Sequence, residues 1–131
     1  VGDDPRMELA RQAIDVTVTH FPLGIGSSNF QAVSETRQIA HNSYLEASAD
    51  LGIIGFSLYV ALLAVFIIRQ WKRYKSTNDK MYFVFFTLGI IYTLDGLFFV
   101  FYNAIWLISF YMLVAAHSET YYKRALSQDK D

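Results

Sequence analysis

The chain of 131 residues contains no cysteine, and only two of its residues are proline. Without cysteine it cannot form a disulfide bond, hold a cysteine-based zinc site or use a thiol nucleophile. Charged residues are also missing from two long stretches: none lies between 51 and 68, and Asp95 is the only one between 81 and 118. An ordinary soluble domain carries about 25% charged residues throughout. The two stretches therefore predict a membrane protein.

The overall charge is nearly balanced, with 11 Lys and Arg against 12 Asp and Glu and a net charge of −1. Because electrostatic binding of nucleic acid needs a basic face, no nucleic-acid partner is expected. His20 and His41 lie far apart in the sequence, and neither belongs to an HxxxH or HxxE pair. The histidine spacing therefore predicts no metal site.

Two stretches are long enough to hold membrane spans. A helix needs about 20 residues to cross a bilayer core of ~30 Å. Residues 51–70 fit one crossing, which runs into the aromatic and basic segment RQWKRYK, typical of a membrane interface. Residues 81–118 would extend roughly 57 Å as one helix, so they predict two crossings, at about 81–97 and 101–118. We place the reversal near 96–102, because Asp95-Gly96 and Asn103 favour a turn.

The positions of the basic residues predict the orientation. Five Lys and Arg lie between 69 and 80, and three more lie in the tail 119–131, whereas residues 1–50 carry three against seven Asp and Glu. By the positive-inside rule, the 69–80 loop and the tail are cytoplasmic. The predicted fold is an all-α polytopic membrane protein with about three transmembrane helices. Residues 1–50 form an extracytoplasmic segment that precedes them.

A helix is predicted at the start of the external segment. Asp4 and Pro5 suit an N-cap and the first helical position. Pro22 would end the helix. Apolar or small residues recur at intervals of three and four, which predicts one stripe suited to a membrane surface: Met7, Ala10, Ile14, Thr17 and Phe21.

A glycine-rich turn follows, with the sequence GIGSSNF at 24–30. It lacks the last glycine of GxGxxG and the GK[ST] of a P-loop, so no nucleotide is expected there. Small residues let backbone N–H groups approach an anion. A plain tight turn is the simpler interpretation.

The segment HNSYLE at 41–46 comes just before the first span. Ser43 and Glu46 have the spacing of a capping box, which predicts that a helix begins here. Helical spacing would place His41, Leu45 and Ser48 on one face. On residue type alone, a solvated histidine is the simpler interpretation of His41.

Three blocks in this order carry a resemblance: RMELAR at 6–11, FPLGIGSSNF at 21–30 and AHNSYLEASADLGIIG at 40–55. Together they resemble the C-terminal domain of the O-antigen ligase/polymerase superfamily. With h for a hydrophobic residue, that domain reads R-x-x-x-W, then P-h-G-h-G-x-x-x-F, then H-N-x-h-L and L-G-h-h-G. The resemblance covers about residues 6–60. Ala10 stands where the family often has tryptophan.

The resemblance implies a GT-C-like glycosyltransferase of the bacterial inner membrane. Family members transfer a glycan from an undecaprenyl-pyrophosphate carrier to lipid A-core, to a growing surface polysaccharide or to protein. By the same resemblance, neither a metal nor a nucleotide sugar is needed as a cofactor. Since no signal peptide precedes the external segment, we also expect the chain to be the carboxyl-terminal part of a longer polytopic protein.

The resemblance also suggests site residues. The family's loop histidine maps onto His41, and its loop arginine maps onto Arg6. A neutral imidazole can take the proton of an acceptor hydroxyl, and a guanidinium offers a planar fork of donors to pyrophosphate. Arg11 and Arg37 match no motif position but lie nearby, and they are further candidates for substrate binding.

Other interpretations stay open. Asp95 is either an intramembrane functional carboxylate or part of a turn-forming Asp-Gly pair. The chain is alternatively a non-enzymatic membrane subunit or an inactive fragment with an external docking surface, since three spans are few to enclose a lipid carrier and an acceptor. A transporter is not expected, because the first span has few polar residues at its centre.

Overall fold

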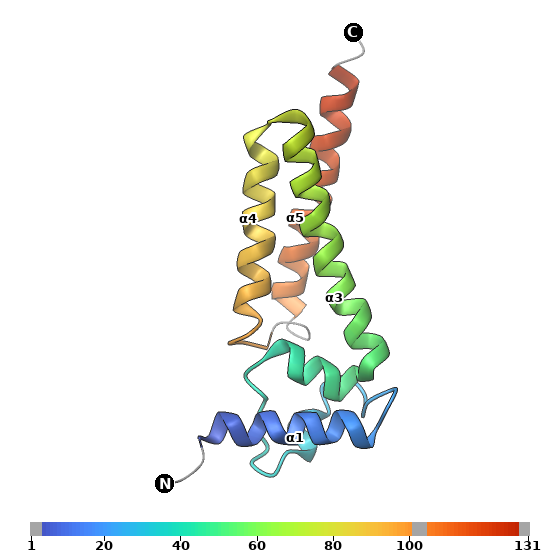
Figure 1. The fold of residues 1–131 in the computed structure, drawn as a ribbon, viewed down its shortest axis with the longest axis vertical. Helices are drawn as coiled ribbons and strands as arrows, with labels where there is room; N and C mark the ends of the chain where they lie inside the picture. Colours follow the sequence, from blue (N-terminus) through green and yellow to red (C-terminus); the bar gives the residue numbers. More distant parts are fainter. Residues whose placement is uncertain (1–3, 101–104, 129–131) are drawn as a thin grey trace.

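The computed structural model describes residues 4–100 and 105–128 and is helical, with no strand in those residues. Figure 1 shows α3, α4 and α5 side by side in an elongated bundle, with α1 lying across one end. The two turns of the bundle lie at opposite ends. The helices are α1 (Pro5–Thr19), α2 (Phe30–Val33), α3 (Ser43–Thr77), α4 (Lys80–Asp95) and α5 (Ile105–Gln128).

Helix α3 begins where the sequence predicts a helix, but a different residue caps it. The N-cap is Asn42, whose side-chain oxygen accepts the backbone N–H groups of Tyr44 (2.9 Å) and Leu45 (3.1 Å). The predicted capping box of Ser43 and Glu46 is therefore wrong. Asn42 is among the best N-cap residues, and Glu46 accepts the N–H of Ala40 instead.

Gly52 interrupts α3 and divides it into two parts. Its φ of 64° and ψ of −174° are not helical. The short part before Gly52 lies between α1 and the bundle, and the long part runs along the bundle (Figure 1). Such a backbone conformation is essentially restricted to glycine. A single residue thus sets the angle between the external segment and the bundle.

The bundle core is aromatic. Tyr59, Leu63 and Phe66 of α3 are buried in one cluster with Tyr82, Phe85 and Tyr111. Large apolar side chains also cover the outer surface of these helices, for example Leu58, Val65, Phe83 and Leu113. Such side chains could lie against the hydrocarbon core of a membrane, where they would avoid the unfavourable contact with water.

Among the described residues, α3 is the one helix that is long and apolar enough to cross a membrane. Helix α4 has 16 residues, which is about 24 Å at 1.5 Å per residue and less than the ~30 Å of a bilayer core.

Helix α1 packs against the rest of the chain through a face other than the stripe predicted for a membrane surface. Leu9 and Ala13 are buried in a second small core with Phe30, Ala40 and Ala49. Met7, Ile14 and Phe21 of the predicted stripe are 57%, 54% and 68% exposed. The helix has two apolar faces, and the one with the small Ala13 packs against α3.

The reversal between α4 and α5 starts at the predicted place. Helix α4 ends at Asp95, the chain turns at 96–98, and residues 101–104 lie outside the described residues. Asp95 is exposed, and its carbonyl accepts the N–H groups of Phe98 and Phe99 at 3.0 Å each. These features fit the turn interpretation of Asp95.

A glycine substitution tests the division of α3. A Cβ atom on Gly52 would overlap the carbonyl oxygen of Pro22, and the positive φ adds about 1–3 kcal/mol of strain. We expect Gly52→Ala to lower the midpoint of thermal unfolding of the detergent-solubilised protein, measured by circular dichroism.

Gly96→Ala is the matched control, because Gly96 has ordinary helical angles and its added Cβ would come no closer than 3.3 Å to another atom. Equal effects of the two substitutions would contradict a special role for Gly52.

Candidate functional site

The glycine-rich turn packs against the interruption of α3. The N–H of Ile25 donates to the carbonyl of Ala49 (3.1 Å), and that of Gly26 donates to the carbonyl of Asp50 (2.8 Å). Gly24 has a φ of 71°, and a Cβ atom there would overlap the backbone of Gly52. The backbone of the FPLGIGSSNF block is therefore in direct contact with the backbone at the LG of the third block.

The carboxylate of Asp50 completes this contact. Asp50 is fully buried, and its two oxygens accept the backbone N–H groups of Ser28 (2.6 Å) and Phe30 (2.7 Å). The turn thus binds an anion, as small residues allow, but the anion is the chain's own side chain. These two N–H groups are already paired, so the turn holds α3 rather than a substrate phosphate.

The residues after His41 attach the start of α3 to the turn that follows α4. The N–H of Ser43 donates to the carbonyls of Gly96 (2.8 Å) and Phe99 (3.0 Å), and its hydroxyl donates to the carbonyl of Phe99 (2.6 Å). The amide of Asn42 donates to the carbonyl of Leu97 (3.1 Å). The H-N-x-h-L block is thereby fixed at the end of the bundle that carries the α4–α5 turn.

His41 itself remains exposed and adopts a left-handed backbone, with φ of 52°. It precedes the N-cap, so the predicted face shared with Leu45 and Ser48 is wrong: those two lie in the helix and His41 does not. The left-handed conformation costs a non-glycine residue roughly 1–2 kcal/mol. Its neighbours maintain it, because the N–H of Ala40 is bound by Glu46 (2.8 Å) and Asn42 is held as described.

The candidate arginines Arg6 and Arg37 are exposed on the surface. Leu9, one turn after Arg6, and Ala40, directly before His41, are buried together in the second small core. Arg37 is exposed and, with a φ of 53°, is also left-handed. Within the described residues, the side chains of Arg6, Arg37 and His41 form no hydrogen bond or ion pair. They are available to a ligand.

Arg11 lies in a different environment. It lines a cavity of about 350 Å³ between α1 and α2, together with the carboxylates of Glu8, Asp15 and Glu35. Three carboxylates around one guanidinium disfavour a pyrophosphate. His41, Arg6 and Arg37 do not line this cavity. Arg6 and His41 thus lie three residues and one residue, respectively, from members of one small core, whereas Arg11 lies beside acidic groups.

Within the described residues, no group of three or more His, Asp or Glu side chains could hold a metal ion. No protein-family model, curated protein or solved structure matches the chain. The resemblance to the O-antigen ligase/polymerase superfamily therefore rests on the three blocks.

Sequence reasoning missed the buried carboxylates that hold this end together. Asp50 and Glu46 are 0% and 1% exposed. One signal was present: Asp50 immediately precedes the long uncharged stretch and lies two residues before Gly52. A carboxylate at that place needs hydrogen-bond donors from elsewhere in the chain.

Paired substitutions at these carboxylates give a prediction. Asp50→Asn replaces one acceptor oxygen by an NH₂ group that cannot accept the N–H of Ser28 or Phe30. We expect a loss of about 1–3 kcal/mol in the free energy of unfolding and faster hydrogen exchange of those two amides, measured by mass spectrometry.

Glu46→Gln is the matched control, because Ala40 needs one acceptor and Gln keeps one. Burial, with the nearby Asp50 carboxylate, raises the pKa of Glu46 above its usual value. Its ionised form therefore opposes folding at neutral pH, and this cost disappears as the pH falls through the pKa. Glu46→Gln should be neutral or stabilising at pH 7, with a smaller gain at acidic pH. A larger loss for Glu46→Gln than for Asp50→Asn would contradict this account.

Proposed function

We propose that the chain is the part of an O-antigen ligase/polymerase-like glycosyltransferase that carries its general base. In this proposal α3, α4 and α5 cross the bacterial inner membrane, residues 1–50 face the extracytoplasmic side, and further helices of a longer polytopic protein complete the enzyme. The substrates are a glycan on an undecaprenyl-pyrophosphate carrier and a lipid, polysaccharide or protein acceptor.

One observation carries the proposal: His41 is exposed in a left-handed conformation that its neighbours enforce. Strained residues of this kind are enriched at active sites. Histidine takes this conformation more readily than most residues, and the strain by itself names no reaction. The function comes from the three blocks, and the geometry supports it because His41 is the one position of the 40–44 segment that forms no hydrogen bond among the described residues.

Each candidate side chain has a role in the glycan transfer. The neutral imidazole of His41 takes the proton of the acceptor hydroxyl as its oxygen forms a bond to the anomeric carbon. The bond from that carbon to the carrier's phosphate oxygen breaks, and the pyrophosphate leaves with the electron pair. Arg6, with Arg37, binds the phosphate oxygens and stabilises the charge that develops there. Attack opposite the leaving group inverts the anomeric centre.

A non-catalytic docking role has support of its own. Met7, Ile14 and Val18 form an exposed apolar face along α1, and the exposed Phe21 follows the helix. Such a face fits a membrane surface or a partner. This function would leave His41 without a chemical role.

Substitution of His41 separates the two functions. We choose His41→Asn because asparagine tolerates a left-handed backbone and lacks a base near neutral pH. Loss of a general base costs ~10²–10⁴ in rate, so glycan transfer in the full-length protein should fall by that factor with carrier binding intact. His20→Asn, at another exposed histidine of the external segment, should transfer at the normal rate.

Arg6→Lys keeps the charge but loses the bidentate fork. It should weaken carrier binding more than it slows turnover of bound carrier, and Arg11→Lys is its control. Membrane levels of all variants must match. Unchanged transfer by His41→Asn would reject the catalytic proposal and leave the docking function.

A further inference from the structure

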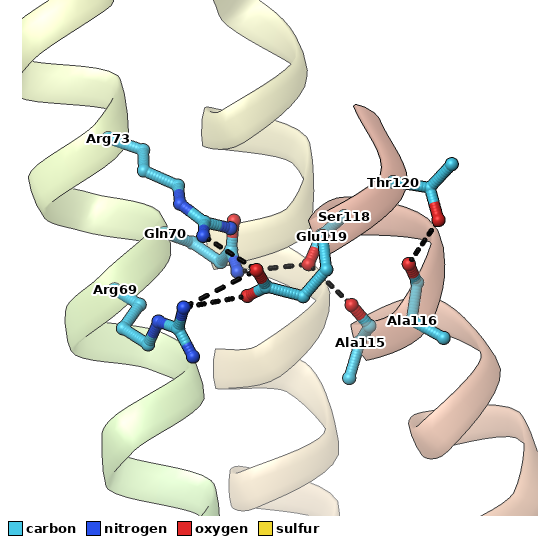
Figure 2. A network of polar contacts seen from close by, with 8 residues as sticks. All are labelled: Arg69, Gln70, Arg73, Ala115, Ala116, Ser118, Glu119 and Thr120. Carbon is cyan, nitrogen blue, oxygen red and sulfur yellow. Dashed lines mark hydrogen bonds and ion pairs between the residues drawn. The ribbon is translucent and has the colours of Figure 1, made fainter. Parts of the chain in front are cut away.

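A second polar site lies at the opposite end of the bundle, between α3 and α5 (Figure 2). The carboxylate of Glu119 accepts a bond from Arg73 (2.9 Å) and pairs with Arg69 (3.1 Å). Next to this ion pair, the Gln70 amide donates to the hydroxyl of Ser118 (3.1 Å). Figure 2 shows Arg69, Gln70 and Arg73 pointing from α3 toward α5.

This site has an excess of positive charge. Two guanidinium groups share one carboxylate, and the hydrogen bond from Arg73 lowers the pKa of Glu119, so the carboxylate is ionised at neutral pH. The side chain of Arg73 is 9% exposed, whereas that of Arg69 is 53% exposed. Arg73 therefore holds Glu119, and Arg69 keeps donors free for a second anion.

Two buried polar atoms of the site have no hydrogen-bond partner within the described part of the chain. They are the amide oxygen of Gln70, a residue that is fully buried, and Nη1 of Arg73. A buried polar group without a partner is strongly unfavourable. The site thus needs one further acceptor, for the N–H groups at Nη1 of Arg73, and one further donor, for the amide oxygen of Gln70.

An apolar groove of about 480 Å³ leads from this polar site along the bundle. Arg69, Gln70 and Glu119 line its polar end. From Leu62 to Gln70 the groove follows α3 for about 12 Å at 1.5 Å per residue. Its apolar wall consists of Leu62, Val65, Phe66, Tyr111, Met112 and Ala115.

We propose that this groove binds an anionic phospholipid whose headgroup carries hydroxyl groups, with one acyl chain along the apolar wall and its phosphate at Arg69. The phosphate oxygens accept from Arg69, and a headgroup hydroxyl donates to Gln70. Basic pockets between membrane helices on the cytoplasmic side suit anionic headgroups, and the positive-inside rule places this end there. The site depends on the proposed membrane orientation and not on glycosyl transfer.

Native mass spectrometry of the detergent-solubilised full chain tests the site, with phosphatidylglycerol and phosphatidylcholine of identical acyl chains as probes. We expect phosphatidylglycerol to bind more tightly by about tenfold or more, as charge-assisted hydrogen bonds allow. Arg69→Gln should remove that preference. Met112→Trp, at a half-exposed position of the wall, should fill the groove and weaken the binding of both lipids.

Lys72→Gln is the matched control, because Lys72 is exposed on α3 and does not line the groove. It should leave phosphatidylglycerol binding unchanged, and circular dichroism must confirm equal helicity of all variants. Equal affinity for the two lipids, an equal loss in Lys72→Gln and Arg69→Gln, or binding unaffected by Met112→Trp would each overturn the proposal.

Discussion

The buried carboxylate of Asp50 controls the end of the molecule that carries His41. Its two oxygens pair with the N–H groups of Ser28 and Phe30, so it fixes the 24–30 turn on α3. That contact requires backbone to approach backbone at Gly24 and Gly52. The interruption at Gly52 then turns the first part of α3 across the end of the bundle, where Ser43 bonds to the α4–α5 turn. His41 lies between these two attachments.

The two ends of the bundle use different chemistry. At the His41 end, small residues and backbone hydrogen bonds hold the chain, and the side chains of Arg6, Arg37 and His41 stay on the surface. At the other end, Arg73 and Glu119 pair with each other at 2.9 Å, and an apolar groove runs between α3 and α5. We associate the first arrangement with binding and chemistry at the extracytoplasmic face of the inner membrane. We associate the second with a lipid of its cytoplasmic leaflet.

Sequence patterns were sufficient for the local features. The helix start at Pro5, the helix start near Ser43 and the turn after Asp95 follow from capping and turn preferences of adjacent residues. Apart from the capping box at Ser43, the failures concern contacts between distant residues. The buried face of α1 depends on Ala13 packing in the same core as Ala49, and the role of the glycine turn depends on Asp50, over 20 residues away. The left-handed backbone of His41 also has no local signal. It depends on bonds at the residues on either side, because Glu46 accepts the N–H of Ala40 and Leu97 accepts a bond from the side chain of Asn42.

Both proposals require the two ends of the bundle to lie on opposite faces of a membrane, with the His41 end outside. Single cysteines in this cysteine-free chain test that directly. Thr36 and Ser76 are exposed at the two ends. In intact cells, an impermeant thiol reagent should label Thr36→Cys and should label Ser76→Cys only after the membrane is opened. Labelling of Ser76→Cys alone, or of both cysteines, in intact cells would contradict the account.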